Sequence, residues 1–432
     1  MSNKPKTKND KAWEKLFDKY SIKEKIKEVG FFKISSAQIN EFREARLMTK
    51  FDHRNNLPQI FEKEKLSILP ITRGDYIIGQ FDVYHTFEKP SHRINKFSFP
   101  SHINSISYDN ITSEANAINA AYISGIIADF TEDEKLLPTV SGRMSSEDFS
   151  FKIKNITNNR LIPIFVSNSQ IEIDGGYEGL NSLIIIEAKN SICNDFLIRQ
   201  LYYPYRLWNK KLHKSVRPVF LTYSNGIFSF YEYTFEDLYK YNSLSLVKQK
   251  NYSIEPDSIT LDDVVTIYKN IKIVSEPSNI PFPQANSFER IINLCEILYE
   301  NDTLSRDEIT YRYDFNSRQT NYYTDAGRYL GLIYKKREDG SIQYYLTSKG
   351  ISLFSNNIKA RNLKFVEYIL EHMPFYLTFK LLLEKGNMPS KQDIVEIMKE
   401  SKVHRIISED TFIRRASTIA SWINWIIKLT MQ

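Results

Sequence analysis

The clearest pattern of apolar and polar positions lies in the middle of the chain. Residues 183–186 are an unbroken apolar run, which predicts a strand that is buried on both faces. Residues 171–174 alternate apolar and acidic side chains, and the sequence GGYEG that follows provides turn residues. The pattern therefore predicts a hairpin of two strands, followed by a helix for which Asn194 or Asp195 is the expected N-cap.

The segments on either side of this hairpin predict the rest of a central unit, which we expect to span residues 106–274. Ser113 is the expected N-cap of its first helix. The apolar run at residues 161–166 is interpreted as the first core strand. Residues 217–223 and 227–234 predict two more strands, the second of them the last, joined by the turn sequence Ser-Asn-Gly. The resulting order of elements is helix, strands, hairpin, helix and hairpin.

Before the central unit, residues 1–105 predict a separate unit of helices followed by a hairpin. Residues 13–29 carry apolar side chains at helical spacing, and residues 35–46 predict a second helix. Residues 66–84 then predict two strands around a turn at residues 72–75.

After the central unit, a linker that contains three prolines at residues 275–284 separates two further units, 285–358 and 359–432. The first has three helical patterns and then two short strands that turn near residues 338–340. The second is helical, and its last pattern covers residues 409–429. The predicted apolar stripe of that last helix consists of Ile419, Trp422, Ile423 and Ile426.

Composition narrows the class of protein only in part. The 432 residues carry a net charge of +6, which permits nucleic-acid binding without demonstrating it. Cys193 and Cys295 have no paired spacing and no neighbouring His cluster, which argues against a zinc site or a disulfide frame and indicates a reducing compartment. The polar start of the chain and the absence of a membrane-spanning apolar window lead us to expect a cytoplasmic protein with no membrane partner.

Charged residues at the end of the predicted buried strand are the first candidates for chemistry. Glu187 and Lys189 project from one face of the strand because strand side chains alternate, while Ala188 points away. The hairpin would bring Asp174 toward them. An unpaired charge at a buried strand end costs free energy, so a carboxylate and an ammonium at this place indicate a role. Two carboxylates and a lysine at one sheet edge suit a hard divalent cation and a phosphodiester.

An Asp, a gap and then Glu-x-Lys resembles the PD-(D/E)xK nuclease superfamily. The resemblance implies an α+β chain with an α/β nuclease core, in which a mixed sheet is flanked by helices. This sequence departs from the motif by having Ile173 where proline is expected. The helix after the motif, with Gln200 and Tyr205, is similar to the Gln-and-Tyr helix of many such nucleases, although Tyr205 comes one position later than usual. The alternative is a structural Glu–Lys pair at a strand end.

The resemblance also implies roles for these residues. Asp174, Glu187 and the carbonyl of Ala188 would bind Mg²⁺, for which Mn²⁺ is expected to substitute. Lys189 would place or deprotonate the attacking water, and Gln200 would steady the lysine or a phosphate. Glu114, in the first helix of the unit, is the candidate for a further active-site acid. The alternative for Glu114 is a carboxylate that interacts with the helix dipole.

The unit at 285–358, with three helices and a basic hairpin, resembles a winged helix-turn-helix. Its third helix would then offer four residues to the edges of DNA bases, namely Arg318, Gln319, Asn321 and Tyr322. The hairpin would place three cations near the DNA backbone, namely Lys335, Lys336 and Arg337. The alternative is a winged helix that serves dimerisation or internal packing.

Further cations are weaker candidates for DNA contacts. Arg143 lies in a serine-rich segment, and Arg414 and Arg415 lie early in the last predicted helix, which could belong to a second helix-turn-helix or brace the core. The cations of the N-terminal unit could contact DNA or belong to a solvated surface; they are Arg46, Lys50, Arg54 and Arg73.

A metal-dependent nuclease fused to a module that reads sequence resembles a type II restriction endonuclease. The resemblance implies hydrolysis of double-stranded DNA at specific sites, a homodimer that cuts both strands, and a cognate DNA methyltransferase that protects the host. The alternatives are a repair or defence nuclease that recognises DNA structure or modification, and a catalytically inactive DNA-binding regulator.

Overall fold

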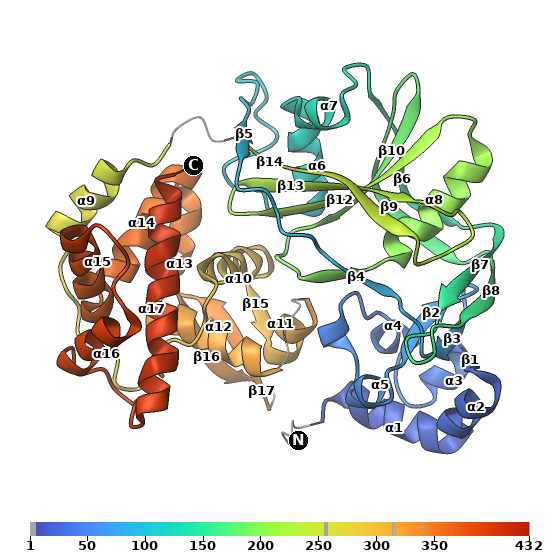
Figure 1. Ribbon diagram of the computed structural model, residues 1–432, viewed down its shortest axis with the longest axis horizontal. Coiled ribbons are helices and arrows are strands. Elements are labelled where there is room, and N and C mark those ends of the chain that lie inside the picture. The colour runs from blue at the N-terminus through green and yellow to red at the C-terminus, as the bar shows by residue number, and fades with distance from the viewer. Residues whose placement is uncertain (1–5, 255–257, 313–314, 316, 339, 432) are drawn as a thin grey trace.

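The computed structural model describes residues 6–254, 258–312, 315, 317–338 and 340–431. Residues 1–5, in the polar start of the chain, and the predicted turn residue Asp339 lie outside these ranges. The fold is of the α+β class, with a mixed sheet in the middle unit, an N-terminal unit below it and C-terminal helices at its side in the view of Figure 1. Within the described residues, no helix has the length and apolar character needed to cross a membrane.

The central sheet has seven strands in the order β5-β14-β13-β12-β10-β9-β6. Strand β10 pairs in parallel with β12 and antiparallel with β9, so it lies inside the sheet. The strands are β5 (Ile94–Lys96), β6 (Leu137–Ser145), β9 (Gln170–Glu178), β10 (Ser182–Lys189), β12 (Ser215–Ser224), β13 (Ile227–Phe235) and β14 (Leu244–Ser253).

Helices cover both faces of this sheet, which explains the unbroken apolar run. On one face, Ile184 and Ile186 pack in the cluster formed with α6 (Glu114–Ile123) and α7 (Ile126–Thr131). On the other, Leu183 and Ile185 pack in a cluster that includes side chains of α8 (Arg199–Lys211). Full burial of each such side chain stabilises the fold by about 1.5–3 kcal/mol. The predicted strand with two buried faces is therefore confirmed.

The predicted hairpin forms, but its glycines have another role than the one we expected. Gly175 and Gly176 lie inside β9, and β9 and β10 pair up to Leu183 and Glu178. A Cβ atom on Gly176 would lie 2.6 Å from the carbonyl oxygen of Val140 in β6, and one on Gly175 would lie 3.0 Å from the Ile118 side chain of α6. The glycines thus allow β6 and α6 to approach β9, and the turn comes after them.

Two of the strand predictions for this unit are wrong. The run at 161–166 forms β8 (Leu161–Ser167), which pairs with β7 (Asp148–Lys154) in a separate two-stranded sheet. Only one of its faces is buried, because Phe165 is exposed whereas Ile164 and Val166 are buried. Strand β6 takes the place that we expected for this run. The strand at 227–234 is not the last either, since β14 pairs along its outer edge.

The N-terminal unit contains the predicted hairpin, whereas each of its predicted helices is divided. The helix expected over 13–29 breaks at Ser21, which adopts a left-handed conformation (φ 50°). The elements are α1 (Lys8–Tyr20), α2 (Ile22–Val29), β1 (Phe31–Ser35), α3 (Ser36–Asn40), α4 (Ala45–Met48), η1 (Arg54–Asn56), α5 (Gln59–Glu64), β2 (Ser67–Pro70) and β3 (Asp75–Gly79).

The boundary that we expected at residue 105 falls inside the central unit. Strand β4 (Tyr84–Thr86) pairs with β11 (Asp195–Leu197), which directly precedes α8. Strand β5 pairs with β14 at one edge of the central sheet. Residues 84–96 are therefore held by the strands of the central unit.

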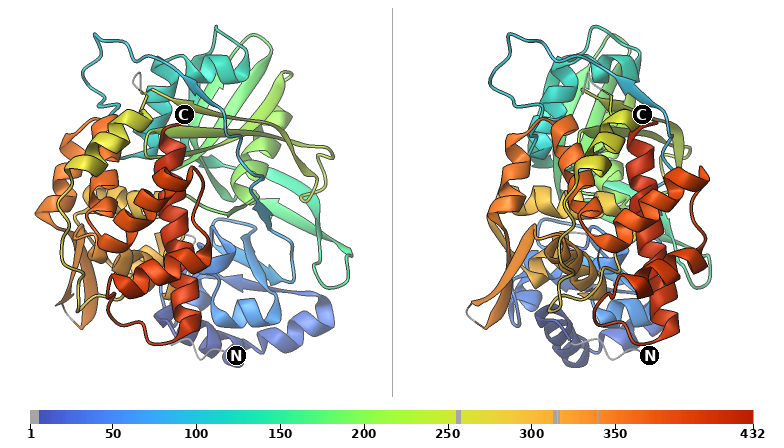
Figure 2. Two further views of the ribbon diagram at one scale, coloured as in Figure 1. Left: turned by 60° about the vertical axis from the view of Figure 1, so that its left-hand side comes forward. Right: turned by 90° about the vertical axis from the view of Figure 1, so that its left-hand side faces the viewer.

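The C-terminal part begins with helices α9 to α12 and a three-stranded sheet in the order β15-β17-β16. Further helices follow and pack beside them (Figure 2). The elements are α9 (Leu261–Asn270), α10 (Phe288–Asn301), β15 (Thr303–Ser305), α11 (Arg306–Arg312), α12 (Ser317–Tyr329), β16 (Ile333–Glu338), β17 (Ser341–Leu346), α13 (Ser348–Ser352), η2 (Leu353–Ser355), α14 (Ile358–Leu370), α15 (Met373–Lys385), α16 (Lys391–Glu400) and α17 (Glu409–Leu429).

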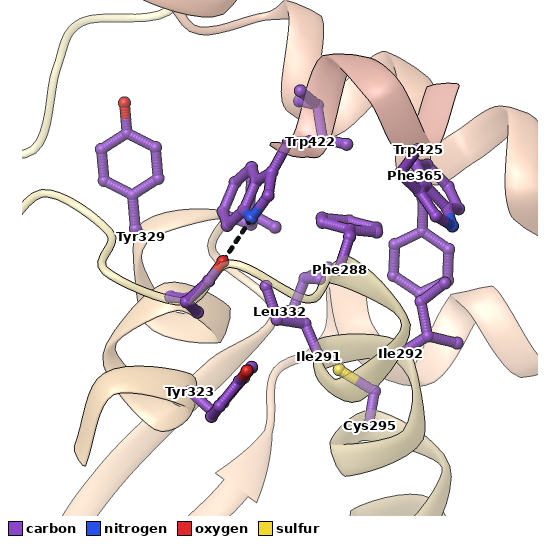
Figure 3. Packing of buried hydrophobic residues seen from close by; sticks show 14 of the residues in the cluster. Phe288, Ile291, Ile292, Cys295, Tyr323, Tyr329, Leu332, Phe365, Trp422 and Trp425 are labelled. Atoms are coloured by element: carbon purple, nitrogen blue, oxygen red, sulfur yellow. Dashed lines mark hydrogen bonds between the residues drawn. The ribbon is translucent and has the colours of Figure 1, made fainter. Parts of the chain in front are cut away.

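One hydrophobic core holds the C-terminal part together, although we expected two units there. The predicted stripe of α17 is confirmed, since Ile419, Trp422, Ile423 and Ile426 are fully buried. Figure 3 shows Trp422 and Trp425 of α17 against Phe288 of α10, and the Trp422 Nε1–H donates to the carbonyl oxygen of Ala285 at 2.7 Å. Helix α9, which we expected in the central unit, contributes Val264 to the same core.

Candidate active site

The candidate site lies where strands β9 and β10 end their pairing. The last paired residues are Gly175 and Ile186, so the next residues, Asp174 and Glu187, face each other just beyond the ladder. The Ala188 N–H donates to Oδ2 of Asp174 at 2.8 Å, where a ladder partner would otherwise accept it. The prediction that the hairpin brings Asp174 next to Glu187 is therefore confirmed.

Lys189 and Gln200 both donate to the same carboxylate oxygen. The Lys189 Nζ lies 2.6 Å from Oε1 of Glu187 and 2.9 Å from the carbonyl oxygen of Ala188. It also lies 3.7 Å from Oε1 of Glu114, at the start of α6. Gln200, in the first turn of α8, donates from Nε2 to Oε1 of Glu187 at 2.6 Å. Three acids, a lysine and a glutamine thus converge from four elements, while their catalytic roles stay a prediction.

Burial and mutual repulsion shape the electrostatics of this group. Burial raises the pKa of the Glu187 carboxyl to about 8, although the Lys189 ammonium acts in the opposite direction. Burial also raises the pKa of Glu114, again against the charge of Lys189. For Lys189, burial lowers the pKa, but the surrounding carboxylates outweigh burial and hold the pKa well above its usual range. Lys189 is therefore an ammonium ion in this environment.

The oxygen atoms at this edge fit a hard cation in their chemistry. Asp174, Glu187 and the Ala188 carbonyl provide oxygen ligands of the kind that Mg²⁺ prefers. Within the described ranges, no three Asp, Glu, His or Cys side chains form a ready-made metal-binding group. Two carboxylates and a carbonyl are thus the expected donors. The Lys189 ammonium contacts two of these three donors, so it would have to move for a cation to use them.

A cleft of about 1190 Å³ opens over the candidate residues. It is lined by the ends of β9 and β10, by the first turns of α6 and α8, by segments of the N-terminal unit and by α10. Arg143 of β6 lines this cleft as well, and its Nε lies 3.2 Å from Oε1 of Glu172 on β9. Arg199 of α8 is a further cation of the cleft. The room and the mixed charges suit a large polyanionic substrate.

The start of α8 differs from the prediction. Neither Asn194 nor Asp195 caps this helix, because residues 195–197 form strand β11 and the helix begins at Arg199 after Ile198. Asp195 instead lies against the N-terminal unit, where His53 Nδ1 is 2.6 Å from the Asp195 carbonyl oxygen. Arg54 bonds to the Tyr84 carbonyl and the Thr86 hydroxyl, so it joins the two units and does not line the cleft.

Asn293 of α10 is a residue of the site region that the sequence reading missed. Its side chain is fully buried, its Nδ2 donates to the Asn190 carbonyl at 2.9 Å, and its Oδ1 accepts from the Ile192 N–H at 3.2 Å. Asn293 thereby holds both sides of the loop that directly follows Lys189. The sequence feature that could have identified Asn293 is a polar residue at an otherwise apolar position of a predicted helix.

The predicted DNA-reading residues lie on the C-terminal helices. Thr320, Tyr323 and Thr324 form the buried face of α12, and the four candidates occupy the remaining positions, with Arg318 exposed and the other three partly buried. The cations of the hairpin are exposed on β16; they are Lys335, Lys336 and Arg337. Lys336 forms an ion pair with Glu338 at 2.8 Å.

Arg414 and Arg415 lie at the start of α17 and differ in exposure. Arg414 is exposed and bonds to its own helix through the Asp410 carbonyl at 3.3 Å. Arg415 is partly buried and donates to Gln284, and desolvation lowers the pKa of its guanidinium. The Gln284 contact ties Arg415 to the segment before α10, and a DNA contact of either arginine stays a prediction.

Three family models match separate segments of the chain, and each is described as a domain of unknown function. DUF6996 matches residues 10–78, DUF6997 matches residues 79–253 and DUF7226 matches residues 290–431. The second match includes strands β4 and β5, in agreement with their pairing, and the third covers most of the C-terminal core, which begins before it at Ile259. No curated protein and no solved structure matches the chain.

Proposed function

We propose that the chain is a magnesium-dependent endonuclease that cuts double-stranded DNA at specific sequences, as type II restriction endonucleases do. The observation that carries this proposal is the cluster of Asp174, Glu187 and Lys189 at one sheet edge, joined by Gln200 and Glu114. Acids that bind a divalent cation and an amine beside them are what phosphodiester hydrolysis requires.

The order of elements around this cluster supports the proposal. Helix α6, strands β6, β9 and β10, helix α8 and strands β12 and β13 follow each other in the chain, with α7, the β7–β8 hairpin and β11 as insertions. The PD-(D/E)xK superfamily has the same order of helix, three strands, helix and two strands. The cluster also occupies the strand end at which that superfamily carries its motif.

Each residue of the cluster has a role in the proposed mechanism. A bound Mg²⁺ would polarise the scissile phosphate and lower the pKa of its water. Lys189 orients the attacking water and offsets the charge that develops on the phosphate, which suits its ammonium form better than a role as base. Gln200 fixes the orientation of Glu187 through its hydrogen bond.

The C-terminal part supports a role in DNA recognition. Its first elements, α10, β15, α11, α12, β16 and β17, have the order of a winged helix, and α12 would be its recognition helix. Because one such site cuts one strand, a double-strand break implies a homodimer. The host of such an enzyme would protect its own DNA with a methyltransferase of the same specificity.

The test is digestion of a plasmid of known sequence in the presence of Mg²⁺, with mapping of the ends. We expect discrete fragments from the wild type and from Lys240→Ala, which removes an exposed lysine outside the cleft. Lys189→Ala should reduce the cleavage rate by about 10²–10⁴-fold and leave DNA binding near the wild-type level. Cutting by Lys189→Ala at the wild-type rate would show that the catalytic assignment is wrong. Scattered ends would instead indicate recognition of DNA structure or modification.

A further inference from the structure

The N-terminal unit forms one wall of the cleft that contains the candidate catalytic residues. In its segment before η1, residues 50–53 all line the cleft; Phe51 and His53 are buried, and the charged Lys50 and Asp52 alternate with them. Lys50 is exposed, and within the described part of the chain its Nζ has an ion-pair partner only in Asp52, at a long 4.0 Å. The anchored aromatic side chains therefore present Lys50 to the cleft.

The tip of the β2–β3 hairpin contributes a second cation to this wall. The Thr72 hydroxyl accepts from the N–H groups of Gly74 and Asp75 at 3.2 and 2.9 Å, which fixes the turn. Arg73 lies in this turn, is exposed and lines the cleft. Among the residues that the structure describes, it has no hydrogen-bond or ion-pair partner. A guanidinium that is held at a cleft without a partner can take an anion.

Contacts between the units fix the position of this wall relative to the catalytic cluster. Tyr203 of α8, one turn after Gln200, donates its hydroxyl to the Pro70 carbonyl at 3.0 Å. The Ser167 N–H donates to the Ile71 carbonyl at 2.8 Å. Leu69, Ile71 and Ile77 also pack in the core cluster of the central unit. The hairpin and the catalytic helix therefore belong to one packed body.

The charges on the two sides of the cleft differ. The central unit brings four acids to the cleft, namely Glu114, Glu172, Asp174 and Glu187, and three cations, namely Arg143, Lys189 and Arg199. The N-terminal unit brings the cations Arg46, Lys50 and Arg73 and one acid, Asp52. Lys50 is within electrostatic reach of the cluster, since its charge acts on Glu114. A cationic wall beside acids that bind a metal suits a backbone of successive phosphates.

We propose that Lys50 and Arg73 bind the DNA phosphates that neighbour the scissile phosphate. The N-terminal unit is then the phosphate-holding wall of the active site and not a separate module that reads sequence. This inference rests on the proposed function for its substrate. Because phosphate contacts position DNA without reading its sequence, the wall sets affinity and orientation and leaves specificity to other parts of the chain.

The test measures binding of the full chain to a DNA duplex at several salt concentrations, in EDTA so that no cleavage occurs. We expect Lys50→Ala and Arg73→Ala each to reduce the slope of log affinity against log salt by about 0.9, the value of one lost phosphate contact. Lys50→Gln should behave as Lys50→Ala, and Lys50→Arg should keep the wild-type slope. The matched controls are Lys27→Ala and Arg160→Ala, which remove exposed cations outside the cleft and should change nothing.

The outcomes of this test are separate from those of the proposed function. Wild-type slopes for Lys50→Ala, Lys50→Gln and Arg73→Ala would overturn the inference, even if the enzyme cuts DNA. Reduced slopes in a protein that does not cut with Mg²⁺ would support the phosphate-holding wall and contradict the endonuclease. Equal loss of slope in the control variants would also overturn the inference, because it would show general attraction by surface charge.

Discussion

Among single residues, the Glu187 carboxyl has the environment that is most unusual for its type. It is buried beside Asp174 and Glu114, and the Lys189 ammonium compensates for this only in part. Its pKa rises from 4.5 to about 8, so the folded protein keeps a proton that the unfolded chain releases at lower pH. The contribution of this carboxyl to stability is therefore full below about pH 4.5 and is lost as pH rises through about 8.

This environment predicts how stability depends on pH. Between about pH 5 and about pH 8, Glu187 should lower the free energy of unfolding by at most about 1.4 kcal/mol per pH unit. Glu187→Gln cannot ionise, so the stability of the wild type minus that of the variant should fall with rising pH across this range. Chemical denaturation in EDTA at a series of pH values measures the difference.

Glu147→Gln is the control for this comparison. Glu147 is partly exposed, and hydrogen bonds from Lys211 and Lys210 lower its pKa, so it loses its proton below the range measured. The free energy of unfolding of this variant should therefore change with pH in the same way as that of the wild type. If the free energy of unfolding of Glu187→Gln also changes with pH as that of the wild type does, Glu187 does not keep its proton in the folded state.

The residues of the candidate cluster could be selected from the sequence because their positions follow from the alternation of a strand. Once residues 183–186 are assigned to a buried strand, Glu187 and Lys189 must share a face. The N-cap at Asp195 could not be judged in the same way. Its carboxylate is used by a segment more than a hundred positions earlier in the chain, near His53, and local spacing carries no information on such a contact.

Among the elements, helix α10 of the C-terminal part holds the loop that directly follows β10. Asn293 bridges the Asn190 carbonyl and the Ile192 N–H, while Arg290 donates to Oδ1 of Asn194 at 3.0 Å. The loop that follows Lys189 is thus held by a helix of the C-terminal part. The orientation of Lys189 should therefore depend on this helix.

Asn293→Ala would leave two backbone groups of that loop without their buried partners. We expect the free energy of unfolding to fall by about 1–3 kcal/mol, the usual cost of unsatisfied buried polar groups. The cleavage rate should fall about tenfold or more from misplacement of Lys189, while the affinity for DNA stays at the wild-type level. Denaturation, single-turnover cleavage and duplex binding measure the three quantities.

Asn301→Ala is the matched control on the same helix, since the Asn301 Nδ2 donates to the Ile297 carbonyl of its own helix. It should change stability little and leave cleavage unchanged. Equal cleavage rates for the wild type and Asn293→Ala would show that α10 does not position the lysine.

The type of an element was predictable where the sequence pattern fits one structure only. The prediction failed where the same pattern fits two structures. The alternation and the Ser-Asn-Gly turn gave the β12–β13 hairpin, which adopts positive φ at Asn225 and Gly226. The segment GGYEG was read as a turn, yet Gly175 and Gly176 serve close packing inside β9, and only Gly179 lies in the turn between β9 and β10. A glycine pair has the same appearance in a sequence in both cases, and only the neighbouring elements distinguish them.

For the whole molecule, the division into units depends on long-range contacts between elements, which local sequence patterns do not reveal. Strand β5 joins β14 across more than 150 positions, and α9 packs with α14 across the proline-containing linker. The prolines of the linker correctly predict a break in helix and strand structure. They do not mark the boundary of a hydrophobic core, because the C-terminal core includes residues on both sides of the linker. The arrangement brings a basic N-terminal wall, an acidic sheet edge and helix α10 of the C-terminal part around one cleft.

This arrangement predicts that sequence recognition and cleavage can be separated by mutation. If α12 reads base edges, Arg318→Ala should reduce the discrimination between the target sequence and single-base variants by about 1–3 kcal/mol. The target itself is obtained from the mapped ends of the plasmid digest. Competition binding against duplexes with one altered base pair measures the loss.

The control for this prediction is Lys335→Ala, which removes an exposed cation from the β16–β17 hairpin of the same unit. A phosphate contact carries no sequence information, so this variant should weaken binding to all duplexes by a similar factor and lower the salt slope by about 1. Since Arg318 lies on a different unit from Lys189, cleavage of saturated target by Arg318→Ala should stay near the wild-type rate. Unchanged discrimination in Arg318→Ala would remove α12 from target reading and favour a winged helix used for packing or dimerisation.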